Sequence, residues 1–152
     1  MSRTREYSAR IDWTGNLGRG TADYRAYSRN HSISAPGKTA PIPGSSDPAF
    51  RGDGTRYNPE DLLVAAVSAC HMLWVLHLCA DAGIVVTAYE DNATGVVEEH
   101  ADGSANFRSV TLRPALVLSD PARVAELPAI HHRVHELCCL ARSVNFPVLV
   151  EG

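Results

Sequence analysis

The most distinctive pattern in the chain is a long apolar run at its centre. Residues 62–80 contain no Asp, Glu, Lys or Arg. The signals for a helix start are strong, because Asn58 can cap the helix, Pro59 suits its first position and Glu60 lies near the positive end of the dipole. Gly83 is a natural left-handed cap at the other end. The pattern therefore predicts one long helix between these two caps.

Alternation of polar and apolar residues predicts strands on both sides of this helix. Before it we expect a hairpin, a short third strand and a long loop, and after it a second hairpin, a second helix interrupted near Pro128 and a closing strand. In chain order these segments are residues 5–13, 21–29, 31–35 and the loop 36–58, then 84–99, 105–118, 120–143 and 145–151. The order β-β-β-α-β-β-α-β predicts an α+β fold in a single domain, residues 1–152.

The central helix also carries an expectation about assembly. A helix that is apolar on all faces is normally buried, and a domain of this size has too little protein to cover every face, so we expect an oligomer. The run approaches the length of a membrane span. However, Ser68, His71, His77 and the lack of flanking basic residues favour a buried helix, and we expect no membrane insertion.

Composition and charge exclude several classes of partner. The net charge of 152 residues is -3, and the basic residues are scattered among acidic ones, so no basic patch is present for nucleic acid or anionic lipid. The N-terminal residues lack the apolar core of a signal peptide, which favours the cytoplasm. Thiols stay reduced there, so a close pair among the four cysteines is more typical of redox chemistry than of a structural disulfide.

The cysteines fall on the two predicted helices. Cys70 lies near the middle of the first, and Cys138 and Cys139 lie near the end of the second. Adjacent cysteines bridge each other poorly, so a redox pair would have to join the helices. Cys79 lies nine residues after Cys70, about half a turn around the axis, so one of these two is expected to be a bystander.

The residues alone leave three interpretations of these side chains open. Free cysteine is among the most buried residue types, so Cys70 could serve as a small apolar core residue. Alternatively, His131 and His135 share one helical face with Cys138 a turn further on, and His71 or Cys70 could complete a zinc site. The third interpretation is a redox-active thiol pair.

Four segments occur in a fixed order across nearly the whole chain: WTGNLGRGT, FRGD, NPEDLL followed by SAC, and VHELCCLARSVNFPV. In this order and spacing they resemble the OsmC/Ohr family of organic hydroperoxide peroxidases. The resemblance implies an OsmC-like fold and an intertwined homodimer with two active sites between subunits. It also implies a cysteine pair that reduces alkyl or lipid hydroperoxides, needs no cofactor, and is reset by a dithiol such as a lipoyl protein.

The resemblance assigns the site residues as well. Cys70 matches the thiol that attacks the peroxide, Cys138 matches the second thiol, and Glu60 matches the glutamate of the NPE segment. The family also uses an arginine of the first hairpin, for which Arg19 is our choice, with Arg51 as an alternative donor. We expect the attacking thiol to become a sulfenic acid, then a disulfide, before exchange with the dithiol restores it.

Two further expectations concern residues around the pair. Cys139 stands where many members have proline, and it is expected to be dispensable, although a third thiol could intercept the disulfide. An apolar wall is expected to favour alkyl or lipid hydroperoxides over hydrogen peroxide. Its predicted residues are Leu63, Val67, Leu73 and Trp74. The alternative function is a non-peroxidatic OsmC-like protein that binds a small ligand or a metal in the same cleft.

Overall fold

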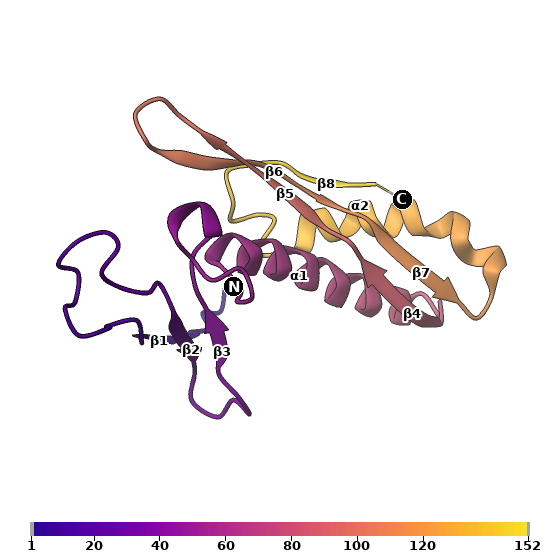
Figure 1. Cartoon of the computed structure of the whole chain (residues 1–152). Coiled ribbons are helices and arrows are strands. Elements are labelled where there is room, and N and C mark those ends of the chain that lie inside the picture. The colour runs from indigo at the N-terminus through magenta and orange to yellow at the C-terminus, as the bar shows by residue number, and fades with distance from the viewer. Residues whose placement is uncertain (1, 152) are drawn as a thin grey trace. The chain divides into compact units, whose positions relative to one another are not determined.

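The computed structural model describes residues 2–151, and Figure 1 shows its helices and strands. The chain divides into two compact units, residues 1–62 and 63–152, with the boundary in the first turns of the long helix. Helices and strands are mixed along the chain, which confirms the α+β class.

The N-terminal unit contains a three-stranded antiparallel sheet of order β1-β2-β3. Its elements are β1 (Arg10–Trp13), β2 (His31–Ser34), β3 (Ile42–Gly44) and the short 3-10 helix η1 (Pro48–Phe50). Ile33 of β2 lies between Ile11 of β1 and Ile42 of β3. The predicted short third strand is therefore the middle strand, and the predicted long loop supplies the edge strand β3.

The strand predicted at residues 21–29 is wrong, because this segment forms successive turns. The N–H of Ala26 donates to the carbonyl of Asp23 at 3.1 Å. The guanidinium of Arg29 lies over the rings of Tyr24 and Tyr27, 4.4 and 3.9 Å from their centres. These local contacts stack the aromatic side chains on an arginine and override the alternating pattern.

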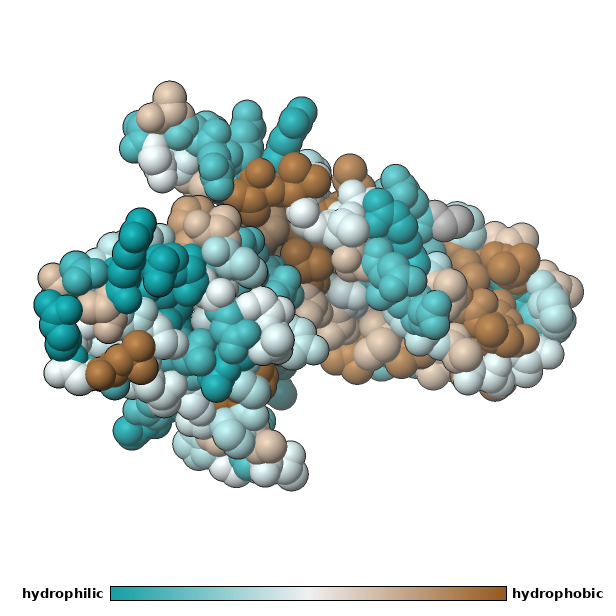
Figure 2. Space-filling model, in the orientation of Figure 1, coloured by the Kyte–Doolittle hydropathy of each residue, from teal (hydrophilic) through white to brown (hydrophobic). Residues whose placement is uncertain are grey.

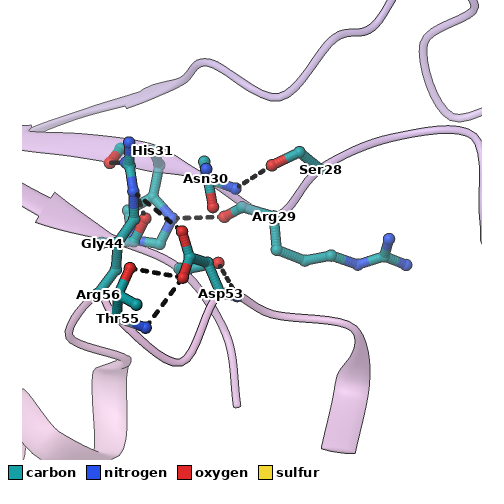
Figure 3. A network of polar contacts seen from close by, with 9 residues as sticks. Ser28, Arg29, Asn30, His31, Gly44, Asp53, Thr55 and Arg56 are labelled. Atoms are coloured by element: carbon teal, nitrogen blue, oxygen red, sulfur yellow. Dashed lines mark hydrogen bonds and ion pairs between the residues drawn. The ribbon is translucent and has the colours of Figure 1, made fainter. Parts of the chain in front are cut away.

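A polar network holds the loop before the long helix against this sheet, as Figure 3 shows. Arg56 donates to the carbonyl of His31 at 3.3 Å and to that of Gly44 at 3.5 Å. Asp53 accepts from the N–H and the hydroxyl of Thr55, at 2.9 and 2.6 Å. The Arg56 side chain thus fixes the loop to backbone groups of β2 and β3, and Asp53 stabilises a turn within the loop.

The long helix α1 (Pro59–Asp81) has the predicted bounds. The N–H of Asp61 donates to the Asn58 side chain at 2.8 Å, and the Asp61 carboxylate accepts the N–H of Asn58 at 3.1 Å, which forms a reciprocal cap. Gly83 has φ +70, and the N–H of Ile84 donates to the carbonyl of Cys79 at 2.8 Å. The helix therefore ends in a left-handed glycine cap, as the sequence predicts.

The C-terminal unit combines most of α1 with a second helix and two small sheets. Strands β4 and β7 pair antiparallel, and the other sheet has the order β5-β6-β8 with β6 and β8 parallel. The elements are β4 (Val86–Asp91), β5 (Thr94–Glu99), β6 (Ala105–Leu112), β7 (Pro114–Leu118), the 3-10 helix η2 (Pro121–Glu126), α2 (Leu127–Leu137) and β8 (Val148–Val150).

Each β-rich run predicted after α1 is divided into two strands. The two breaks, after Asp91 and at Arg113, lie opposite each other, because the Asp91 carboxylate accepts the N–H of Arg113 at 2.6 Å. The same carboxylate accepts the hydroxyl of Ser68 at 2.6 Å, which ties α1 to this point. The half-buried Asp91 carboxylate thus holds together the point where both runs pass from one sheet to the other.

The core of this unit forms along one stripe of α1, where every fourth residue from Val67 is buried. The stripe consists of Val67, His71, Val75 and Cys79. Val75 and Cys79 pack in a cluster with residues of β7 and α2, and Val67 packs in a second cluster with residues of β6 and β8. At Gly95 of β5, a Cβ atom would lie 2.7 Å from Val64 of α1, so only glycine allows this close approach.

Much of α1 outside the stripe is exposed in the single chain, as shown by Leu73 at 62% exposure. Figure 2 shows further apolar patches on the surface of the face in view. Among the described residues, α1 is the one helix long and apolar enough to cross a membrane, and core helices of soluble proteins have the same composition. The oligomer expected from this helix stays a prediction.

Candidate active site

Two thiols from distant parts of the chain meet in the C-terminal unit. The Sγ atoms of Cys70 in α1 and Cys138 after α2 are 2.8 Å apart, although 68 positions separate the residues. Both are free thiols, Cys138 at 1% exposure and Cys70 half-buried. A disulfide needs an S–S distance of about 2.05 Å. The two sulfurs therefore have to move only slightly closer for oxidation to join them.

The end of α2 brings Cys138 to this place. The predicted second helix is shorter than expected: it ends at Leu137, and Cys138 has an extended backbone with φ −68 and ψ 113. The N–H of Cys138 still donates to the carbonyl of Val134 at 2.8 Å, and the chain then folds back in turns. The thiol therefore projects from the end of the helix and not from its side.

The three residues after α2 lie around the Cys70 sulfur. Cys138 contacts it directly, and the backbone N–H of Leu140 and the side chain of Cys139 lie close enough to act on its pKa. Burial raises the pKa of the Cys70 thiol most, the contact with Cys138 raises it further, and the nearby donors of Leu140 and Cys139 lower it. The net pKa is raised, so this unit alone does not favour the thiolate.

The other two cysteines have different surroundings. Cys79 is fully buried in the core cluster of α1, β7 and α2, and burial raises its pKa. It fits the bystander role that helical geometry predicts. Cys139 is exposed, beside the buried Cys138.

The other predicted site residues belong to the N-terminal unit. Glu60 is exposed in the first turn of α1, ten residues before Cys70 on a continuous helix. The Arg19 side chain is 71% exposed and lies 3.8 Å from the carboxylate of Asp23. Arg51 ends η1 with a left-handed backbone, φ 63. The roles of these residues toward Cys70 stay predictions.

A pair of histidines connects the same two helices next to the thiols. His71 Nε2 and His131 Nδ1 are 2.9 Å apart, and the rings stack with centres 5.1 Å apart. Burial, together with the nearby His131, lowers the pKa of His71 to about 4, and burial lowers that of His131 as well. Both shifts favour uncharged rings, in which the N–H of one ring donates a hydrogen bond to the bare nitrogen of the other.

This pairing bears on the metal interpretation. Within residues 2–151, no three His, Cys, Asp or Glu side chains lie together in a way that would hold a metal ion. His131 bonds to His71, and the set of His131, His135 and Cys138 does not assemble. The spacing of His131 and His135 on one helical face was a correct observation, but the partner of His131 is a second histidine.

The face of α2 that carries these histidines borders a cavity of about 600 Å³. Most of its lining is apolar and comes from β7, η2, α2 and β8. The lining residues are Pro114, Leu116, Val124, Leu127, Pro128, His131, His132, His135 and Val150. None of the cysteines is among them.

The predicted apolar wall does not form as a unit. Val67 is fully buried in the core and so cannot line an open substrate site, and Leu73 points outward at 62% exposure. Leu63 and Trp74 are half-buried against different core clusters. The apolar surroundings of Cys70 instead come from the core cluster against which it packs, as Trp74 and Leu140 also do.

Comparisons with known proteins agree with this architecture. The family model for OsmC-like proteins matches residues 52–151. An OsmC-like protein of unknown function from Vibrio cholerae is 32% identical, with 97% of this chain and 99% of that chain covered and a TM-score of 0.87. No curated protein matches the chain.

Two more distant structures share the fold. The organic hydroperoxide resistance protein OhrB of Bacillus subtilis is 20% identical, with 95% of this chain and 97% of that chain covered and a TM-score of 0.63. An organic hydroperoxide resistance protein of Legionella pneumophila is 16% identical, with coverage of 97% and 96% and a TM-score of 0.68. Together with the family match over the segment that holds both thiols, these likenesses show that the chain belongs to the OsmC-like family and has its fold.

Proposed function

We propose that this protein is a cysteine-based peroxidase that reduces organic hydroperoxides. The observation that carries the proposal is the 2.8 Å contact between the sulfurs of Cys70 and Cys138. Two thiols this close can pass from sulfenic acid to disulfide with little movement of the backbone. A purely structural cysteine would not need a second thiol against it.

The chemistry is a two-step oxidation of the thiol pair. The Cys70 thiolate attacks one oxygen of the hydroperoxide, the O–O bond breaks, and the alkoxide leaves and takes a proton as the alcohol. Cys70 is then a sulfenic acid. The Cys138 sulfur attacks it, the S–O bond breaks, a disulfide forms and water leaves. A dithiol such as a lipoyl protein then reduces the disulfide by exchange.

Activation of Cys70 requires a positive charge, because its surroundings in the C-terminal unit raise its pKa. Arg19 is our proposed donor of this charge, with Arg51 as the alternative. Ten residues of helix correspond to a rise of about 15 Å, too far for Glu60 to reach Cys70 of its own helix. We therefore propose that Glu60 acts from the partner chain of a homodimer.

The substrate class follows from the surroundings of the attacking thiol. Cys70 packs against an apolar cluster, against which Trp74 and Leu140 also pack. An alkyl group gains about 0.8 kcal/mol for each methylene that it buries, a gain that hydrogen peroxide cannot make. The related structures from Bacillus subtilis and Legionella pneumophila are named for resistance to organic hydroperoxides, which supports the same class. A cytoplasmic address suits the cycle, because thiols stay reduced there.

A second candidate function is binding of a small apolar ligand without peroxidase turnover. The cavity of about 600 Å³ beside α2 favours it, since ligand pockets of this size are largely apolar with a few polar groups. The 32% identical relative has no known function that would decide between the two. In this case a hydroperoxide would leave the thiols intact.

A thiol count tests the proposal directly. The fully reduced protein has four thiols for each chain, and one equivalent of cumene hydroperoxide should leave two. Cys70→Ser should lose none, and the double variant Cys138→Ser with Cys139→Ser should lose only the Cys70 thiol, as a sulfenic acid that dimedone traps. Cys79→Ala is the control, and two of its three thiols should be lost. If all four thiols of the wild-type protein survive, it is not a peroxidase of this kind.

A further inference from the structure

Three sulfur atoms meet at the candidate site, and only one of them is freely accessible. The Cys70 sulfur lies 2.8 Å from that of Cys138, and the side chain of the next residue, Cys139, lies close enough to act on the Cys70 thiol. Cys138 is 1% exposed, whereas Cys139 is exposed. The proposed cycle uses the first two thiols and leaves the accessible one without a role.

Accessibility matters most in the last step of that cycle. Thiol exchange requires the attacking sulfur to approach one sulfur of the disulfide from the side opposite the bond that breaks. In a Cys70–Cys138 disulfide, one sulfur is buried and the other is half-buried against the core cluster of α1, β7 and α2. A dithiol attached to a large carrier therefore meets a disulfide with little open surface.

We propose that Cys139 is a third catalytic cysteine, which takes over the disulfide from Cys138 and presents it to the reductant. Its position directly after Cys138 keeps its thiol near Cys70, and its exposure in the single chain gives a reductant access to it. Cys138 and Cys139 do not have to bridge each other, which adjacent cysteines do poorly, because both exchange on the same partner, Cys70. This inference rests on the proposed peroxidase function and replaces the dispensable role expected for Cys139.

The exchange balances without any further oxidant. The Cys139 thiolate attacks the Cys70 sulfur, an S–S bond forms between them, and the Cys70–Cys138 bond breaks. The electron pair leaves on the Cys138 sulfur, which takes up the proton that Cys139 gave up. One thiolate of the external dithiol then attacks Cys139 and releases Cys70. The second thiol of the reductant displaces Cys139, and the reductant leaves as a disulfide.

The exchange has two consequences that a structural role for Cys139 would not have. A fraction of the oxidised protein should carry its disulfide at Cys139, since the two disulfides share Cys70 and can interconvert within one chain. Reduction by a carrier-bound dithiol should also depend on Cys139, whereas formation of the first disulfide should not.

The location of the disulfide is measured by differential alkylation of the full-length protein. The reduced protein is oxidised with one equivalent of diamide, free thiols are blocked with light N-ethylmaleimide in acid, and the disulfide is then reduced and labelled with the heavy reagent. Trypsin cleavage after Arg133 and Arg142 yields one peptide with both cysteines, and its fragment ions separate Cys138 from Cys139. We expect heavy label at Cys139 within about tenfold of that at Cys138, as for two states of similar stability.

The rate of reduction is measured with a reduced lipoyl domain. After diamide oxidation, Cys139→Ser should be reduced at least about tenfold more slowly than the wild type, the effect of losing the intramolecular exchange. Its first disulfide should form at the wild-type rate, and dithiothreitol, a small dithiol, should reduce it with a smaller defect. Asn145→Ser, an exposed replacement in the same segment, is the control and should behave as the wild type.

Two results would overturn the exchange role. One is a wild-type rate of reduction by the lipoyl domain in Cys139→Ser, and the other is heavy label confined to Cys138 in the wild-type protein. Diamide oxidises the thiols whether or not the protein reduces peroxides. Failure of the exchange is therefore distinguished from failure of the peroxidase proposal, which shows instead as no loss of thiols with cumene hydroperoxide.

Discussion

Replacing His71 with glutamine should remove part of the acid sensitivity of the fold. His71 is buried at 3% exposure, and its pKa of about 4 lies well below the ordinary value of 6.5. Burial is the largest cause of this low pKa. The nearby His131 and His135 of α2 lower the pKa further, and Asp91 of β4 raises it. Glutamine places an amide near the Nε2 position, so it can keep a hydrogen bond to His131 but cannot take up a proton.

The sign and size of the effect follow from the two pKa values. Between pH 6.5 and 4 the unfolded chain binds a proton at His71 that the folded chain does not, so stability is full above pH 6.5 and is lost as the pH falls. The complete loss corresponds to about 3 kcal/mol, of which about 2 kcal/mol falls between pH 7 and pH 5. The lowered pKa of His131 acts in the same direction.

Urea denaturation at pH 7 and pH 5, at one protein concentration, measures this difference. Between pH 7 and pH 5, the free energy of unfolding of the wild type should fall by about 2 kcal/mol more than that of His71→Gln. This difference does not depend on how stable the variant is at pH 7. His132→Gln changes a histidine whose side chain is 84% exposed and should keep the wild-type dependence. Equal losses in the wild type and His71→Gln would refute the burial argument for this pair.

Three other changes test the remaining proposals. If Glu60 acts across the dimer, a mixture of Cys70→Ser and Glu60→Ala chains should recover roughly a quarter of wild-type activity, because half the dimers are mixed and half their sites are intact. No recovery after confirmed subunit exchange would exclude a role of Glu60 across the dimer. Arg19→Ala should move the pH profile of Cys70 alkylation upward by about one pH unit, and a shift only in Arg51→Ala would transfer the role. Tyr89 has a buried hydroxyl without a hydrogen-bond partner among the described residues. Tyr89→Phe should therefore leave the free energy of unfolding unchanged or raise it by up to about 1 kcal/mol. A clear loss of stability in urea denaturation would show that the hydroxyl has a partner.

The sequence predicted best those features that depend on neighbouring residues. The cap at Asn58 and the stop at Gly83 are local signals, and the structure confirms both. The alternation at residues 21–29 was also local, but stacking of tyrosines on Arg29 overrode it. The division of the later β-rich runs depends on a contact between Asp91 and Arg113, which alternation cannot reveal.

The candidate site shows the same limit. Helical geometry separated Cys79 from Cys70, and the resemblance selected Cys138, which the structure places against Cys70. The metal interpretation brought His71 near His131, but their direct hydrogen bond was not predicted, because i, i+4 spacing shows which residues share a face and not what lies opposite. Likewise, the sequence could not show that Cys139 lies near Cys70, because this depends on α2 ending at Leu137, directly before Cys138.

The contact between Cys70 and Cys138 also has a consequence for chain topology. A bond between residues 68 positions apart would close almost half of the chain into a covalent ring and restrict the unfolded state. By loop entropy, such a ring stabilises the fold by about 4 kcal/mol. Each turnover would then alternate the protein between a linear form and a more heat-resistant circular one. The melting temperature would report the oxidation state of the molecule without any label, and the reduced form, ready to react, would be the one most exposed to unfolding.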